Sequence, residues 1–209
     1  MDDPKALPFD PEAVAELVQR AKRELRKSAK KMRLGIPRGA LATRGAALVE
    51  RLREELGDAR RVALFHPIEA QREVDLRALD PAIRAAGGLV AYPAFLEDRT
   101  MVFRDPGSLE ALVDRGSGFL EPPPDAERVE ELDVIVVPAL LVDANGHRLG
   151  YGGGFYDRTL PRFCPPARAV AAVFDFQLAA DLPSTTTDVR VNAVVTDRKV
   201  LRFDDARAP

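Results

Sequence analysis

Hydrophobic residues at helical spacing predict a long helix at the start of the chain. The apolar stripe of residues 11–33 consists of Val14, Leu17, Val18, Ala21, Leu25 and Met32. Positions three and four apart lie on one face of a helix, so this spacing is typical of an amphipathic helix. Asp10 and Pro11 supply an N-cap and a first-turn proline, and Gly35 ends the pattern. We therefore expect a helix over residues 11–33.

Downstream of this helix, short apolar runs alternate with helical patterns. A second helix is predicted from about Arg38 to Leu56, and the second half of segment 67–88 is also helical in pattern. A short helix is predicted within 155–163. Strands are predicted at 60–66, 89–95, 100–104, 133–143, 167–176 and 189–197.

The run DVIVVPALLVD at 133–143 predicts the strongest strand, because a continuous run rich in β-branched residues is typical of a strand buried on both faces. Residues 115–127 are too rich in glycine and proline for regular structure. Alternating strands and helices favour an α/β fold. We expect one three-layer domain over residues 1–209, with a mostly parallel sheet and helices on both faces.

Composition narrows the class of protein. Hydrophobic residues make up 46% and charged residues 31%, which indicates a folded chain rather than a disordered one. The formal net charge of −2 argues against non-specific nucleic-acid binding. Cys164 is the only cysteine and is interpreted as an incidental thiol.

The N-terminus lacks the pattern of a secretory signal, and no apolar run is long enough to span a bilayer. We expect a cytoplasmic monomer.

The stretch RLGYGGGFYDR at 148–158 carries the candidate chemistry. Glycines let backbone N–H groups approach an anion, and a strand, a glycine loop and a helix form a phosphate-binding arrangement. The loop lacks the Lys-Ser/Thr of a Walker loop, and its G-x-G-G-G spacing differs from the dinucleotide fingerprint. The alternative is a mobile turn without a ligand. The flanking residues favour a binding loop, because a turn needs none of Arg148, Tyr151, Asp157 and Arg158.

A longer stretch, VPALLVDANGHRLGYGGGFYDRTLPR, resembles the signature of the 5-formyltetrahydrofolate cyclo-ligase family. Weaker matches extend over nearly the whole chain: KRELR at 22–26, EVDL at 73–76, GFLEP at 118–122 and TDVRVNAVVTD at 187–197. The resemblance implies an enzyme that uses ATP and Mg²⁺ to convert 5-formyltetrahydrofolate to 5,10-methenyltetrahydrofolate, with release of ADP and phosphate. Its partners would be these small molecules, with no membrane and no nucleic acid.

The resemblance also implies roles for residues on the ATP side. The ATP-binding set would be Lys22, Arg26, Arg148, Gly150, Gly152, Gly153, Gly154 and Tyr156. Asp157 and Asp188 would bind Mg²⁺, which typically takes one or two protein carboxylates plus phosphate oxygens. For Lys22 and Arg26 the alternative is a solvated basic stripe that continues through Lys30 and Arg33. Asp157 could instead cap its helix, Asp188 could be a loop acid, and Tyr156 could simply pack.

On the folate side, the resemblance implies contacts from Phe65, Glu73, Tyr151 and Phe155, with Arg148 and Tyr151 as catalytic residues. Glu73 could accept hydrogen bonds from the pterin amino and ring N–H groups; the alternative is an acid at a helix N-terminus. His147 is interpreted as exposed and incidental.

Three positions depart from the family pattern, and one segment is longer. Leu76 stands where the family has Thr, Thr187 where it has His, and Asn192 where it has Asp; segment 66–72 is longer than usual. These departures leave open an ATP-binding relative of the family that acts on a different acceptor. A second alternative is a non-enzymatic module that binds RNA through the basic helix from Lys22 to Arg33.

Overall fold

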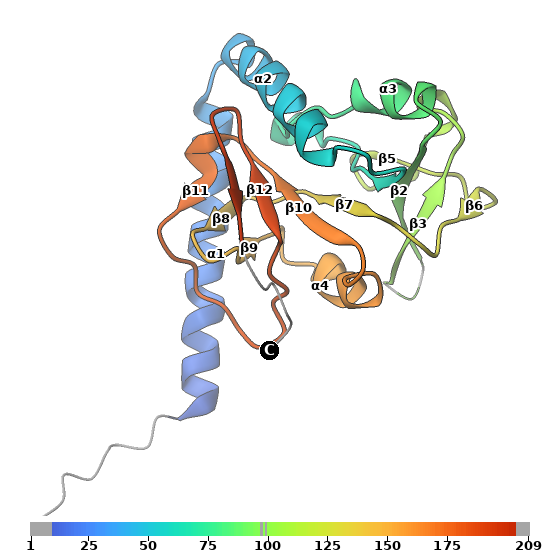
Figure 1. Ribbon diagram of the computed structural model, residues 1–209. Coiled ribbons are helices and arrows are strands. Elements are labelled where there is room, and N and C mark those ends of the chain that lie inside the picture. Colours follow the sequence, from blue (N-terminus) through green and yellow to red (C-terminus); the bar gives the residue numbers. More distant parts are fainter. Residues whose placement is uncertain (1–9, 97, 99, 204–209) are drawn as a thin grey trace, which may run out of the picture.

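A mixed sheet runs through the middle of the structure, with helices on both faces (Figure 1). The computed structural model describes residues 10–96, 98 and 100–203. The strands of this sheet are β1 (Arg61–Ala63), β2 (Leu89–Phe95), β3 (Met101–Asp105), β6 (Glu127–Arg128), β7 (Val134–Val137), β10 (Arg168–Ala172), β12 (Ala193–Val195) and β13 (Val200–Arg202). Across the sheet, their order in the described residues is β13-β12-β10-β7-β1-β2-β3-β6.

The central strands are parallel and the outer ones antiparallel. β1 pairs in parallel with β2 and β7, and β10 pairs in parallel with β7 and β12. The pairs β2–β3, β3–β6 and β12–β13 are antiparallel. The predicted α/β fold with a mostly parallel sheet is therefore confirmed.

Successive residues of the central strands enter different cores, one on each face of the sheet. Val134 and Val136 pack in one core, while Ile135 and Val137 pack in the other. α2 (Arg38–Leu56) and α3 (Leu79–Ala85) cover the first face, and α4 (Phe155–Thr159) covers the second (Figure 1). A strand with both faces covered needs an apolar residue at every position, which explains the continuous hydrophobic runs in the sequence.

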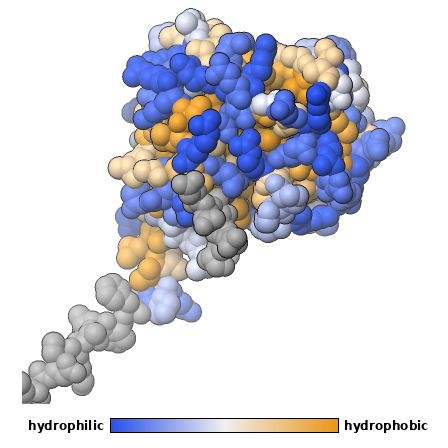
Figure 2. Space-filling model, in the orientation of Figure 1, coloured by the Kyte–Doolittle hydropathy of each residue, from blue (hydrophilic) through white to orange (hydrophobic). Residues whose placement is uncertain are grey.

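The long N-terminal helix, α1 (Pro11–Gly35), begins as predicted, with the Asp10 carboxylate accepting a hydrogen bond from the Glu12 N–H at 3.0 Å. Its first half projects from the body, and apolar side chains are exposed there (Figures 1 and 2). Leu17 is 64% exposed, and the buried residues of the helix are Lys22, Ala29 and Arg33. The buried face thus overlaps the apolar stripe only in part, at the half-buried Val18 and Leu25. No helix in the described ranges combines the length and hydrophobicity needed to cross a membrane.

The single strand predicted over 133–143 is wrong, because the run is broken into two strands. Proline has no N–H for a sheet ladder, and Pro138 follows β7 directly. The chain then enters β8 (Leu141–Asp143) of a smaller sheet with β9 (Arg148–Leu149) and β11 (Leu178–Ala179). The buried Gln177 side chain donates to the carbonyls of Ala139 and Leu140 at 3.0 and 2.9 Å, which satisfies the backbone at the break.

Short strands also occur where the sequence pattern missed them. β5 (Leu120–Glu121) pairs with β4 (Val113–Asp114), and β6 begins at Glu127, so the prediction that 115–127 lacks regular structure is wrong at these positions. β13 was not predicted. Strands of two or three residues are too short to display a period of two, so hydrophobic patterning does not reveal them.

Asp143 fixes the hairpin that leads into the glycine loop. Its side chain is fully buried and accepts hydrogen bonds from the N–H groups of Asn145, His147 and Leu182 at 2.8, 2.9 and 3.1 Å. His147 Nδ1 lies 3.3 Å from the same carboxylate. The prediction that His147 is exposed and incidental is wrong, because its side chain is only 26% exposed and belongs to this turn.

Asp143→Ala should lower the free energy of unfolding by about 3 kcal/mol, since each buried donor left without an acceptor costs about 1–3 kcal/mol. Chemical denaturation of the two proteins would measure the difference. Asp181→Ala, at an exposed position in the segment after β11, is the matched control and should change stability by less than about 0.5 kcal/mol. Equal stability of the two variants would contradict the structural role of Asp143.

Candidate functional site

A cavity of about 2010 Å³ opens where the ends of β1, β2 and β7 meet the glycine loop at 148–154. Pockets for one small ligand usually measure about 300–1,000 Å³, so this space is large enough for two ligands. All residues predicted for the site line it, namely Lys22, Arg26, Phe65, Glu73, Arg148, Gly150, Tyr151, Gly152, Gly153, Gly154, Phe155, Tyr156, Asp157 and Asp188. The structure thus brings together residues from both ends of the chain, while their roles stay predictions.

The glycine loop needs its glycines at particular positions. Gly152 has φ +106° and Gly154 has φ +65°, conformations that residues with a side chain rarely adopt. A Cβ on Gly152 would also lie 3.4 Å from Cζ of Arg26. Arg26 Nε donates to the Gly150 carbonyl at 2.9 Å, so α1 and the loop are held against each other.

Gly152→Ala should destabilise the protein by about 1–3 kcal/mol, the usual cost of forcing a non-glycine residue into such backbone geometry. Gly150→Ala is the control, because its backbone is ordinary and a Cβ there would meet nothing within 4 Å. Thermal unfolding of both variants would measure the effect. If Gly150→Ala lost as much stability as Gly152→Ala, backbone strain would not be the cause.

Lys22 lies at the inner face of α1 and is 5% exposed. Its Nζ donates to Asp188 Oδ2 at 2.5 Å. The alternative of a solvated basic stripe is therefore wrong for Lys22 and for Arg33, which is 2% exposed. Lys30 of the same stripe is half-buried, and its Nζ lies 5.0 Å from the centre of the Tyr151 ring.

Asp188 is held by several donors. Oδ2 also accepts hydrogen bonds from the Thr185 N–H at 2.6 Å and from Thr185 Oγ1 at 3.0 Å. Burial favours the neutral acid, but these donors and the Lys22 charge outweigh it, so the pKa of Asp188 is lowered. Thr187, where the resemblance leads us to expect a histidine, is within hydrogen-bond distance of Thr185, with the two hydroxyl oxygens 3.1 Å apart. The orientation of Asp188 is thus defined without a histidine.

Arg148 and Asp157 form the most buried ion pair of the glycine loop. Arg148 Nη2 donates to Asp157 Oδ1 at 3.0 Å, and the Val189 N–H donates to the same oxygen at 3.1 Å. The N-cap of α4 is Gly154, so Asp157 does not serve only as a helix cap. Within the described residues, Arg148 Nε is buried and has no hydrogen-bond partner. A buried donor without a partner is unusual and fits a ligand oxygen.

Asp157 and Asp188 each accept hydrogen bonds through one of their two carboxylate oxygens. In the described part of the chain, the hydrogen bonds of Asp157 converge on Oδ1 and those of Asp188 on Oδ2, which leaves one oxygen of each carboxylate for another ligand. No cluster of three or more acidic, histidine or cysteine side chains suited to a metal occurs among the described residues. The donor set fits Mg²⁺, which is usually bound by one or two carboxylates together with substrate phosphates and water.

Glu73 and Tyr151 meet on the other side of the cavity. The Tyr151 hydroxyl donates to Glu73 Oε1 at 2.5 Å, and the Ile68 N–H donates to Oε2 at 2.8 Å. Burial raises the pKa of Glu73, although these hydrogen bonds and the Arg33 charge oppose that effect. Burial and the nearby Glu73 charge raise the pKa of Tyr151. Glu73 lies in a loop before α3, so the alternative of a helix N-terminal acid is wrong.

Aromatic rings form one wall of the cavity. Phe155 contacts Phe95 edge to face with ring centroids 4.4 Å apart, and Phe95 contacts Phe119 at 5.5 Å. Phe95 and Phe119 were not predicted as site residues. The buried Glu121 of the GFLEP motif holds this wall, because it accepts hydrogen bonds from the Phe95 N–H at 2.9 Å and from Ser117 Oγ at 2.5 Å. Phe119 belongs to the same GFLEP motif as Glu121, so the motif could have indicated Phe119 as a site residue.

The departures at positions 76 and 192 lie in different surroundings: Leu76 is in the core, whereas Asn192 lines the cavity, where it lacks the charge of an aspartate. Leu76 is fully buried in the core that α2 and α3 cover. Asn192 lines the cavity, but its Oδ1 accepts a hydrogen bond from the Ala169 N–H at 2.8 Å, an interaction that an aspartate would also make. Cys164 fits the prediction of an unreactive thiol, since burial raises its pKa to about 11.

Comparison with known proteins links the chain to one family. The model of the 5-formyltetrahydrofolate cyclo-ligase family matches residues 18–197. A 5-formyltetrahydrofolate cyclo-ligase of Mycolicibacterium smegmatis is 44% identical over 97 residues, which cover 45% of this chain and 48% of that protein. The Escherichia coli K12 enzyme of the same name is 33% identical over 148 residues, which cover 68% of this chain and 80% of that protein.

Similarity extends to a solved structure. The NMR structure of a 5,10-methenyltetrahydrofolate synthetase from Aquifex aeolicus superposes with a TM-score of 0.77 at 30% sequence identity. The superposition covers 90% of this chain and 95% of that protein. The likeness therefore extends over most of the chain rather than the glycine motif alone.

Proposed function

Because the chain belongs to the 5-formyltetrahydrofolate cyclo-ligase family, we propose that it converts 5-formyltetrahydrofolate to 5,10-methenyltetrahydrofolate with the hydrolysis of ATP to ADP and phosphate. One observation carries the proposal most strongly. A cavity large enough for two ligands is lined at one end by cations, carboxylates and a glycine loop, and at the other by a buried glutamate and aromatic rings.

The cationic end suits the triphosphate of ATP. Arg148 brings a buried guanidinium whose Nε has no partner in the described part of the chain, and Lys22 and Arg26 reach the same space from α1. Phosphoryl transfer depends on placing donors and positive charge around the phosphoryl oxygens. Backbone N–H groups from Gly150 to Gly154 would contribute as an anion-binding loop.

Mg²⁺ would be held by the free oxygens of Asp157 and Asp188 together with phosphate oxygens and water. When bound, it would neutralise charge on the β- and γ-phosphates. Arg148 and Lys22 would hold the two carboxylates in place, since each donates to the oxygen that the metal does not need.

The aromatic end suits the flat folate ring system. Glu73 would accept hydrogen bonds from the pterin amino and ring N–H groups, and Phe65, Tyr151 and Phe155 would contact the ring faces. Flat, apolar walls with a few convergent polar groups are typical of small-molecule sites. The junction of the two ends lies at Tyr151 and Arg148 of the glycine loop, which we propose as the catalytic residues.

The residues can be placed in a balanced reaction. The formyl oxygen attacks the γ-phosphorus, the bond to the β–γ bridging oxygen breaks, and ADP leaves. N10 of the folate then attacks the formyl carbon and gives up its proton, the carbon–oxygen bond breaks, and phosphate departs with that proton as hydrogen phosphate. Arg148 would stabilise charge on the transferring phosphoryl group, while the aromatic wall keeps the formyl group aligned with it.

The direct test is an absorbance assay for methenyltetrahydrofolate with purified protein, 5-formyltetrahydrofolate, ATP and Mg²⁺. We expect product only when all three small molecules are present. ATP binding without product would favour the alternative acceptor. Saturable, salt-sensitive RNA binding without either activity would favour the RNA-binding module.

A further inference from the structure

Arg33 is buried beneath the folate end of the cavity, although it belongs to the basic run of α1. It is 2% exposed, and Nη2 donates to the Tyr151 hydroxyl. Its Nε is buried and has no partner among the described residues. The guanidinium Cζ lies 5.9 Å from the centre of the Tyr151 ring. Burying an arginine in this way is costly unless it serves a specific partner.

The hydrogen bonds define the direction of one proton. Arginine only donates, so the Tyr151 oxygen must accept from Arg33. The single hydroxyl proton of Tyr151 is then free to point at Glu73 Oε1, 2.5 Å away. The Ile68 N–H occupies Oε2 as a second donor. Both oxygens of Glu73 are therefore acceptors, which is the arrangement of an ionised carboxylate.

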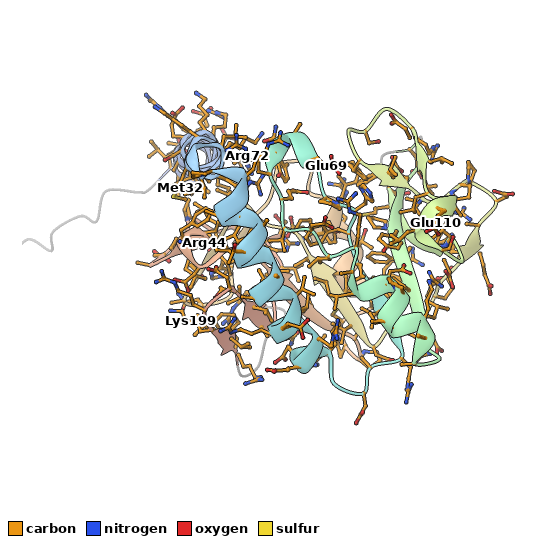
Figure 3. The ribbon with its side chains drawn as sticks, turned by 90° about the horizontal axis from the view of Figure 1, so that it is seen from above. Met32, Arg44, Glu69, Arg72, Glu110 and Lys199 are labelled. Atoms are coloured by element: carbon orange, nitrogen blue, oxygen red, sulfur yellow. The ribbon has the colours of Figure 1, made fainter. Side chains whose placement is uncertain are left out.

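The loop that carries Glu73 is tied to the end of α1. Arg72 Nη1 donates to the carbonyls of Leu34 and Ile36 at 2.5 and 2.6 Å. Figure 3 shows Arg72 beside Met32 at this end of the helix. The longer 66–72 segment thus places Glu73 at a set distance from Arg33, with Tyr151 between them.

We propose that Arg33 is a positioning residue that directs the Tyr151 proton to Glu73 and thereby selects ligands that present adjacent hydrogen-bond donors to this carboxylate. This inference rests on the proposed function and deepens it: the donors would be the amino and ring N–H groups of a 2-amino-4-oxo-pteridine. A ring that presents an acceptor at either position would face a carboxylate oxygen and be rejected.

Electrostatics agrees with the geometry. Burial raises the pKa of Glu73, whereas its hydrogen bonds to Ile68 and Tyr151 and the charge of Arg33 lower it. The other titratable groups around Glu73 in the described residues are Tyr156 of α4 and Lys30 of α1, whose Nζ lies 5.0 Å from the Tyr151 ring centre. Without the charge of Arg33, the pKa of Glu73 should rise further and favour the neutral carboxylic acid. The neutral acid carries an O–H donor at the place where the ligand N–H groups need an acceptor.

The test compares Arg33→Met with wild type by steady-state kinetics. We expect KM for 5-formyltetrahydrofolate to rise about tenfold at neutral pH, the usual effect of losing a hydrogen bond to a charged group, with little change in kcat or in KM for ATP. The acidic limb of kcat/KM should move to higher pH. Arg33→Lys should restore part of the affinity. Arg23→Met, at an exposed position of the same helix, should behave as wild type.

A double-mutant cycle separates positioning from general stability. Because Arg33 acts through the Tyr151 hydroxyl, Arg33→Met should have little further effect on KM in a Tyr151→Phe background. Additive effects of the two changes, or an unmoved pH profile, would overturn the inference. If Arg33→Met does not fold by circular dichroism, Arg33→Lys is carried through the same cycle. Failure of the proposed function can be distinguished from failure of this inference, since the wild-type protein would then form no methenyltetrahydrofolate.

Discussion

Replacing Arg148 with methionine should lower kcat/KM about a thousandfold, since an arginine that stabilises charge in phosphoryl transfer is worth about 10³–10⁵ in rate. Its guanidinium is buried and is oriented by Asp157, and its Nε has no hydrogen-bond partner among the residues that the structure describes. Methionine keeps much of the volume and removes all five donors. The methenyl-forming assay would measure the loss.

Two further variants sharpen this experiment. Arg148→Lys retains a charge but not the planar fork, so it should recover only part of the activity. Arg162→Met is the control, because Arg162 lies just after α4 and its side chain is 54% exposed; it should stay within about twofold of wild type. Activity of Arg148→Met within tenfold of wild type would remove Arg148 from the phosphate site.

The second large effect is expected from Asp157→Asn. Even residues that only support a metal ligand change metal affinity by about 10–100-fold, so loss of a ligating carboxylate should weaken apparent Mg²⁺ affinity at least a hundredfold. Asparagine can still accept from Arg148 Nη2 and the Val189 N–H, so the fold should stay intact. A Mg²⁺ titration of activity and Mg²⁺-dependent ATP binding by calorimetry would both report the change.

Excess Mg²⁺ should restore part of the activity of Asp157→Asn, because weaker binding can be overcome by mass action. Asp181→Asn, at an exposed position, provides the control for the same chemical change. Full activity at wild-type Mg²⁺ concentrations would exclude Asp157 from the metal site. Thermal unfolding should separate this result from a loss of structure.

Local sequence patterns predicted helices and strands well where the hydrophobic pattern or a terminating glycine was clear. α2 and β2 have the bounds expected from the sequence, since the first is stopped by Gly57 and the second is a continuous apolar run. Such signals lie within one short segment, so they are readable without the fold. The glycine loop was likewise evident, because its unusual spacing and flanking charges are local features.

Local patterns gave wrong predictions where contacts with distant segments determine the structure. The 133–143 run has the composition of one strand, yet Pro138 and the Gln177 side chain divide it between two sheets. The apolar stripe of α1 indicated its helical form correctly, but the packing of the helix also buries Lys22, Ala29 and Arg33, which lie outside that stripe. A periodicity describes the faces of a helix and does not identify its neighbours.

By itself, the sequence determined the α/β class and the family, and it supplied the side chains that we propose to bind ATP and folate. Only the tertiary structure decided which of them meet. Arg33, Glu73 and Tyr151 are separated by up to 118 positions, and their contact depends on how α1, the 66–72 segment and the glycine loop pack. Hydrogen-bond direction and burial arise from that packing, because both depend on three-dimensional distances that no local pattern contains.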